Sequence, residues 1–321
     1  DDTTSETATY SPSTSTHPEV IVETGTRGSI VAASLASSTN HTMTPSDPFP
    51  LVESGQALPT VDASGVRDNV VTSFSWSPAG GALPPNASFT FGVLYAFANG
   101  DVGAVESDIA SFVANRSASQ ALADEIAGQQ AYVSSSTIPA GLSAVERTLS
   151  GHSLAYLHAA QVITPNGGVD DKPHGQIVAS LPPGEWNITW VRDASYATEA
   201  LLDAGKIDDA TSSLRFFLDG DASHVAQSFV PEMPSYLVSV VRYFGGGRED
   251  SDVNASGPNI EWDDFGLFLH AFSRALSDGA PLSPADVATV KSQVADVLLA
   301  LIDPQTGLLI ADSSIWETHW D

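Results

Sequence analysis

Three short clusters in the sequence combine tryptophan with charged side chains, a pattern suited to sugar chemistry. The first contains Trp186, Trp190, Arg192 and Asp193, where a loop leads into a predicted helix. An indole can stack on the apolar face of a pyranose, while guanidinium donors and carboxylate acceptors hydrogen-bond its hydroxyl groups. The alternative is a surface Arg–Asp pair beside tryptophans that cover a core edge. An arginine near the positive end of a helix dipole is unfavourable, so Arg192 needs a further reason to be there.

The second cluster lies within Asn259–Gly266 and contains Glu261, Trp262, Asp263 and Asp264, at the start of a predicted helix. Two interpretations remain open. Asp263 or Asp264 is expected to serve as the N-cap of that helix, which explains the acid without any function. Otherwise Trp262 or its neighbours contribute to ligand binding.

The third cluster contains Trp316 and Glu317, close to the last residue of the sequence. A carboxyl group flanked by large aromatic side chains is partly desolvated, which raises its pKa and keeps a proton available near neutral pH. A general acid requires such a proton. The alternative is a glutamate at the rim of hydrophobic packing.

Other catalytic chemistries lack their usual signatures. The eight histidines include no HExxH motif, and the sequence has no cysteine, no G-x-S-x-G motif and no phosphate-binding loop of the GxxxxGK[ST] type. Metal-dependent hydrolysis, thiol or serine catalysis and nucleotide chemistry are therefore not indicated. We predict no cofactor and no metal site.

Charge and composition narrow the partners. The chain has 321 residues, with 39 Asp and Glu against 12 Lys and Arg, which gives a formal net charge of −27. This charge disfavours binding to nucleic acids and anionic membranes. The sequence also contains no run of 18 apolar residues, the length that a bilayer-spanning helix needs. A Ser/Thr-rich start at Thr3–Thr16, together with Asn-x-Ser/Thr sites, favours a secreted protein, extracellular or on the cell surface.

The elements that must position these residues change type along the chain. Residues 1–104 contain β-branched and aromatic runs between Pro- and Gly-rich turns, which predict an antiparallel sandwich or part of one. Residues 105–138 are a helical linker, and residues 139–321 are mostly helical. The predicted strands are Val20–Glu23, Ser29–Ala36, Val70–Ser77 and Ser88–Ala98.

Apolar residues recur at helical spacing through most of the second half. A β-branched stretch between Phe229 and Gly247 is instead predicted to be a strand or hairpin. Ser283 and Pro284 give a cap and a first-turn proline to the last helix. The predicted helices are Leu142–Gln161, Ala194–Ala204, Ile207–Leu218, Asp264–Leu276 and Pro284–Leu301.

The stretch Gly175–Leu202 (GQIVASLPPGEWNITWVRDASYATEALL) resembles glycoside hydrolase family 15, the glucoamylase and glucodextranase group. The resemblance continues through Gly257–Gly266 (GPNIEWDDFG) to Trp316 and Glu317. The W-x-R-D and W-E motifs occur in the order typical of the family.

This resemblance implies a multidomain β plus α protein: an antiparallel β-supersandwich in part, a helical linker and half of an (α/α)6 toroid. It implies that Trp190, Arg192 and Asp193 hold the non-reducing end of an α-glucan or oligosaccharide, and Trp262 and Trp316 are further candidates for substrate binding. Glu317 matches the general acid of the family, and the implied reaction is inverting, exo-acting hydrolysis of terminal α-glucosidic bonds.

The sequence departs from the family pattern after Glu317. An inverting enzyme needs a second carboxylate, which the family carries well downstream of the W-E motif. We therefore assign no general base, and we expect a C-terminal half of the same protein, as a separate chain or as missing sequence, to complete the site. Two alternatives stay open: a carbohydrate-binding or structural surface protein without turnover, and a sugar lyase or phosphorylase on a similar toroid.

Overall fold

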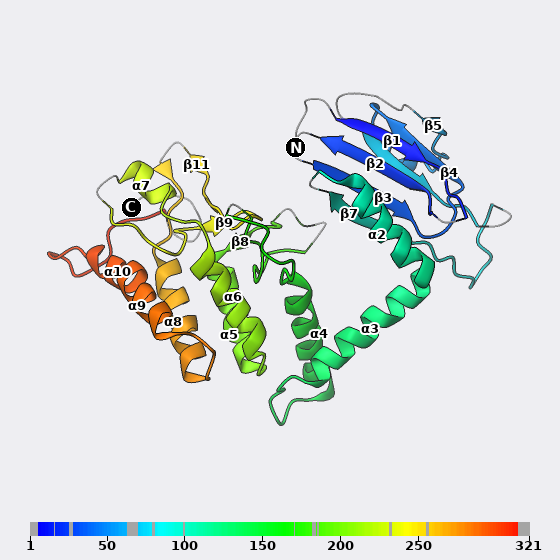
Figure 1. Ribbon diagram of the computed structural model, residues 1–321. Coiled ribbons are helices and arrows are strands. Elements are labelled where there is room, and N and C mark those ends of the chain that lie inside the picture. The colour runs from blue at the N-terminus through cyan, green and yellow to red at the C-terminus, as the bar shows by residue number, and fades with distance from the viewer. Residues whose placement is uncertain are drawn as a thin grey trace. The chain divides into compact units, whose positions relative to one another are not determined.

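A computed structural model divides the chain into two compact units, Asp1–Gly128 and Gln129–Asp321 (Figure 1). The first unit contains the larger β-sheets and the second contains most of the helices, so the chain is a multidomain β plus α protein. The residues that the structure describes are 6–15, 17–25, 28–62, 70–78, 81–98, 100–169, 171–181, 184, 186–230, 233–254 and 257–313.

The main sheet of the first unit has four antiparallel strands in the order β1-β2-β3-β7. A second sheet has the order β5-β4-β6, with β4 antiparallel to β6 and parallel to β5. The strand bounds are β1 Thr7–Ser11, β2 Val20–Gly25, β3 Gly28–Ser34, β4 Asn40–Thr44, β5 Val61–Asp62, β6 Val71–Ser75 and β7 Val93–Ala98.

Alternation along β2 places the two small cores of this unit on opposite faces of the main sheet. Val20 and Val22 pack with Ile109 of helix α2 (Val102–Asn115), whereas Ile21 packs with Met43 of the second sheet. This is the two-residue periodicity that a strand requires when both of its faces are covered.

Three of the four predicted strands are confirmed as β2, β3 and β6, but Ser88–Ala98 forms a strand only from Val93 onward. The prediction missed β1 and β4. Their sequences, TATYS and NHTMT, are largely polar, and the side chains that they bury include only one sizeable apolar group, Met43. A search for apolar runs therefore had little to detect in them.

Helices connect the sheets to the rest of the chain. Besides the short α1 (Phe49–Glu53), the first unit contains α2, whose N-cap Asp101 accepts a hydrogen bond from the backbone N–H of Ala104 at 3.0 Å. Helix α3 (Ala118–Ser134) follows and contains the division between the two units. The helical prediction for this part of the chain is confirmed.

The predicted helices of the second unit are confirmed, with small shifts of their ends. Ser283 forms a capping box with Asp286 at the start of the last helical run, which includes one π-helical turn, Lys291–Ala295. In the described part of the chain, every helix falls short of the length or the hydropathy that a bilayer crossing needs. The bounds are α4 Ala144–Ala160, α5 Val191–Asp203, α6 Ile207–Asp219, α7 Val225–Phe229, α8 Asp263–Ser277, α9 Pro284–Val290 and α10 Asp296–Ala300.

One core holds the second unit together. Helices α5, α6 and α8 lie side by side and contribute Leu201, Leu214 and Phe268, all with 1% exposure or less (Figure 1). The α9–α10 run adds Val294 to the same cluster. Burial of each such side chain contributes about 1.5–3 kcal/mol, so this core fixes the starts of α5 and α8 relative to one another.

The strand or hairpin predicted between Phe229 and Gly247 is wrong for most of that segment. Among its described residues, only Arg242–Tyr243 forms a strand, β9, which lies between β8 (Thr189–Trp190) and β10 (Glu249–Asp250). The apolar residues before β9 are buried without regular secondary structure, because side chains accept hydrogen bonds from their backbone N–H groups. The Val240 N–H donates to Glu249 Oε1 at 2.9 Å, and the Val241 N–H donates to Ser239 Oγ at 3.1 Å.

Candidate functional site

Arg192 and Asp193 lie in the first turn of α5, directly after the short strand β8. Trp190 occupies the N-cap position, and its side chain makes no capping hydrogen bond. Strand β8 pairs with β9 through Trp190 and Arg242, so a β-ladder holds the backbone from which the helix begins. The predicted position of these residues at a helix start is confirmed.

The misplaced positive charge of Arg192 is balanced by carboxylates from the start of α8. Arg192 Nη1 donates a hydrogen bond to Glu261 Oε2 and lies 3.8 Å from Asp263 Oδ2. Burial alone would lower the pKa of Arg192, but Glu261, Asp264 and Asp263 together outweigh it and raise the pKa. The arginine thus remains charged at a helix N-terminus because nearby anions offset the helix dipole.

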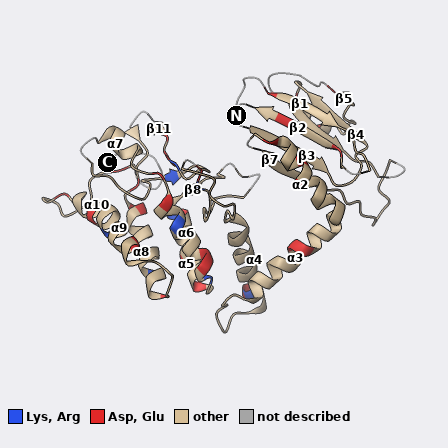
Figure 2. Ribbon diagram, viewed as in Figure 1, with Lys and Arg blue, Asp and Glu red and all other residues tan. Residues whose placement is uncertain are grey.

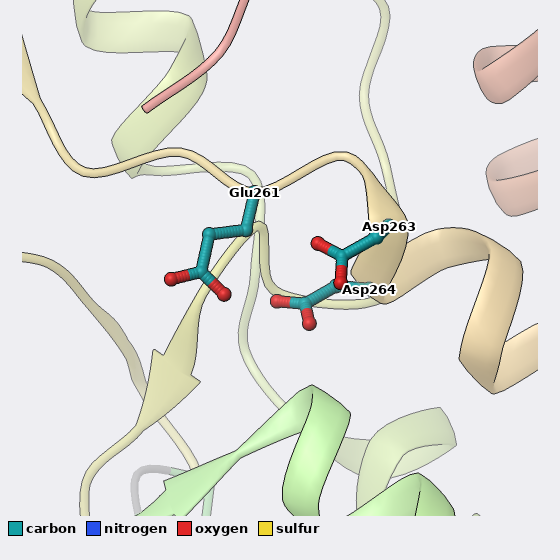
Figure 3. Close-up of side chains that lie close together, drawn as sticks. All are labelled: Glu261, Asp263 and Asp264. Carbon is teal, nitrogen blue, oxygen red and sulfur yellow. The ribbon is translucent and has the colours of Figure 1, made fainter. Parts of the chain in front are cut away.

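Three carboxyl groups meet at this point. One oxygen each from Glu261, Asp263 and Asp264 lies within 4.8 Å of the others, and Figure 3 shows the Glu261 and Asp264 carboxyl groups extending toward one another. Asp264 is fully buried, and neither of its oxygens has a hydrogen-bond partner among the described residues. Burial, followed by the negative charges of Glu261 and Asp263, raises the pKa of Asp264 well above its usual value.

The expected N-cap role of Asp263 or Asp264 is wrong. Helix α8 begins at Asp263, so both residues lie within its first turn, and Trp262 occupies the N-cap position. Acidic side chains there still suit the positive end of the helix dipole. Burial raises the pKa of Asp263, although the charge of Arg192 opposes that effect.

The same three carboxylates are the only group in the described part of the chain with spacing suited to a metal ion. Oxygen ligands of this kind suit Ca²⁺ or Mg²⁺. However, the Arg192 guanidinium already supplies a positive charge to Glu261 and Asp263. Arg192 therefore accounts for Glu261 and Asp263 as ion-pair partners, and we assign no metal to the cluster.

Two tryptophans predicted to bind substrate are buried. Trp190 is 8% exposed: the Arg242 guanidinium lies 5.3 Å from its ring centre, and Trp186 contacts it edge-on at 5.4 Å. Trp262 is 1% exposed and packs beside Phe265. In the first cluster Trp186 is the exposed indole, at 53%. Trp190 and Trp262 thus lie next to the charged residues of the site, with their side chains buried in the core.

Sequence reasoning missed Arg242 as a part of this site. Its side chain is 5% exposed and forms ion pairs with Asp250 at 3.0 Å and with Asp252 at 2.7 Å. Figure 2 shows few basic residues among many acidic ones. Arg242 is one of these few, and it is buried against the ring of Trp190. Arg242 falls in the segment predicted to be a strand or hairpin, and nothing in its local sequence indicated a contact with residue 190.

The described chain ends beside this cluster. The Ser313 N–H donates to the Ile260 carbonyl at 2.9 Å, and the Ile260 N–H donates to Ser313 Oγ at 2.8 Å. Next to it, Asp312 accepts a hydrogen bond from the Trp262 N–H at 3.0 Å. Trp316 and Glu317, the other two predicted site residues, lie outside the described residues.

Comparisons with known proteins add one likeness of fold. No family model and no curated protein sequence matches the chain. Its structure is similar to a crystal structure of a bacterial glucoamylase complexed with acarbose, with a TM-score of 0.58 and 13% sequence identity. The match covers 94% of this chain and 39% of the glucoamylase chain. At this identity the likeness concerns the fold, and the chain spans well under half of the glucoamylase's length.

Proposed function

We propose that this chain is part of a glycoside hydrolase that removes glucosyl units from the non-reducing ends of α-glucans or oligosaccharides, with inversion at the anomeric carbon. The observation that carries the proposal is the partly exposed Arg192, beside Asp193 and the carboxylates of Glu261 and Asp263, at the start of α5. The likeness of the fold to a glucoamylase supports the same conclusion.

In this proposal Arg192 and Asp193 hold the terminal sugar. The Arg192 side chain is 21% exposed and is hydrogen-bonded to Glu261, and its guanidinium is proposed to reach the ligand while Glu261 holds it. Trp190 and Trp262 support the binding residues from behind, since both are packed into the core. Trp316 is proposed to cover the sugar, next to the catalytic acid.

Glu317 is proposed to be the general acid that protonates the departing glycosidic oxygen. It follows Ser313 by four residues, and four residues span at most roughly 14 Å even when fully extended. Ser313 is hydrogen-bonded to Ile260, the residue before Glu261. This short reach supports the proposal that Glu317 acts near the Arg192 cluster. The general base of an inverting enzyme requires a second carboxylate about 6.5–9.5 Å from the acid, and we assign it to no residue of this chain.

A C-terminal half is proposed to complete both the toroid and the site. Helix α4 exposes Val145, Leu149 and Tyr156 at helical spacing, each more than 60% exposed. Leu299 of α10 is also exposed. Further helices that pack on these side chains would bury them, as in a closed (α/α)6 toroid. In this scheme residues 1–104 are the β-domain, residues 105–138 the linker and residues 139–321 the first half of the toroid.

The test is glucose release from maltooligosaccharides by the intact protein with Glu317→Gln. Loss of a general acid is expected to lower kcat by about 10²- to 10⁴-fold with little change in KM. Glu199→Gln is the matched control because Glu199 of α5 pairs with His270 of α8, and it is expected to keep full activity. Activity of Glu317→Gln within a few-fold of wild type removes this residue from the role. Sugar binding without any turnover by the wild-type protein supports the carbohydrate-binding alternative.

A further inference from the structure

The Arg192 guanidinium is hydrogen-bonded to Glu261, and the Arg192 side chain is 21% exposed. A guanidinium carries five N–H donors. The one hydrogen bond that it donates within the described part of the chain goes to Glu261, while Asp263 lies 3.8 Å from the same Nη1. Its remaining donors lack a described acceptor, and the side chain is partly exposed. The hydrogen bond to Glu261 thus restrains the direction in which the remaining donors point.

Glu261 is itself held firmly. Its side chain is completely buried, and its backbone N–H donates to the Val240 carbonyl at 2.8 Å. The preceding residue, Ile260, forms three hydrogen bonds with Ser313. The following residue, Trp262, is fully buried in the core. Glu261 therefore presents its carboxylate from a fixed backbone position.

Stability alone does not account for this pair. Removing two charged groups from water costs several kcal/mol per ion, so a buried ion pair often adds little net stability compared with apolar packing. What such a pair does provide is a fixed geometry for the partner side chain. A long, flexible arginine that must meet a ligand with several donors benefits from that restraint, because less conformational freedom is lost on binding.

We propose that Glu261 is a positioning residue, which holds one edge of the Arg192 guanidinium so that the remaining N–H donors are directed at the hydroxyl groups of the bound sugar. This inference rests on the proposed function, since it takes a saccharide as the ligand of Arg192. Glu261 itself does not touch the substrate or take part in proton transfer.

The experiment measures acarbose and maltotriose binding by calorimetry, with steady-state kinetics on maltooligosaccharides, for Glu261→Gln in the intact protein. The amide keeps the size of the side chain but loses the charge that holds Arg192. We expect binding to weaken and KM to rise about 10- to 100-fold, with kcat changed less than three-fold. Glu199→Gln, which breaks another contact between α5 and α8, is expected to leave affinity within two-fold of wild type.

A double-mutant cycle separates positioning from a merely structural role. In the Arg192→Ala background, Glu261→Gln is expected to have no further effect on affinity, because the side chain that it positions is gone. Should Glu261→Gln fold poorly, Glu261→Asp provides the same cycle with a shorter carboxylate. Equal losses in the two backgrounds, or unchanged affinity in the folded single variant, overturn the inference. If the wild-type protein binds neither saccharide, the proposed function fails, and the inference fails with it.

Discussion

Replacing Arg192 by methionine removes the positive charge that contacts Glu261 and Asp263. The substitution keeps a long apolar side chain but leaves Glu261 fully buried without the cation that it contacts. Breaking a buried ion pair from one side costs about 3–5 kcal/mol. Because Arg192 is 21% exposed and water can partly replace it, we expect a loss near the lower end, about 3 kcal/mol at pH 8.

The pH dependence of this loss has a definite sign. Burial raises the pKa of Asp263 and Asp264 in the folded protein, and the charge of Arg192 partly opposes that rise. A carboxyl group whose pKa is raised by folding contributes stability when protonated, and this contribution is lost as pH rises through the folded-state pKa. Without Arg192 both pKa values rise further, so the loss is expected to be smaller at pH 5 than at pH 8.

The assay is equilibrium unfolding in urea, followed by tryptophan fluorescence, at pH 5 and pH 8. Five of the six tryptophans follow residue 128, so the signal reports mainly on the second unit. The double variant Arg192→Met/Glu261→Gln is expected to be about 1–2 kcal/mol more stable than Arg192→Met, because it removes the buried negative charge that no longer contacts Arg192. A single-variant loss below 1 kcal/mol at pH 8, or a loss that does not depend on pH, refutes this reasoning.

Two further predictions concern the frame of the second unit. Arg215 donates hydrogen bonds to both oxygens of Asp286 at 2.8 and 2.7 Å. These bonds are the largest cause that lowers the pKa of Asp286, to about 2. The ionised Asp286 therefore stabilises the fold above the usual carboxyl pKa, and this contribution is lost as pH falls toward 2. Asp286→Asn is therefore expected to lower the free energy of unfolding by about 1 kcal/mol at pH 7 after solvent screening. The same difference between wild type and variant at pH 2 and at pH 7 contradicts this prediction. Gly175 has a φ of +86°, and an added Cβ would lie 2.0 Å from the Ser212 carbonyl oxygen, so Gly175→Ala is expected to cost more than about 2 kcal/mol in thermal unfolding. Gly279→Ala, at the same φ but in open space, is expected to cost about 1 kcal/mol, and equal losses at the two sites count against the steric argument.

Much of the fold could be predicted from the sequence because its helices are strongly amphipathic. In α5, α6 and α8 the buried residues recur at helical spacing, and Ser283 with Pro284 marked the start of α9. The two polar strands β1 and β4 and the irregular segment before β9 could not be predicted in this way. In that segment Glu249 and Ser239 satisfy the backbone, and no local pattern reveals such a long-range arrangement.

The candidate site was predictable only in part. The unusual position of Arg192 was a usable signal, since an arginine at a helix start needs an anion nearby. Its partner Glu261 lies 69 residues away in the sequence, so the pairing depends on how α5 and α8 pack. The N-cap expectation failed for a related reason: Asp263 and Asp264 have the residue type of a cap, but the backbone turns into the helix one residue earlier, after Trp262.

The measurement that tests the central claim most directly is proton NMR of the first glucose that the intact protein releases from a maltooligosaccharide. Inverting hydrolysis predicts that the β-anomer appears first, with the α-anomer following only at the rate of mutarotation. Initial release of the α-anomer, an unsaturated product or a requirement for phosphate would contradict the account.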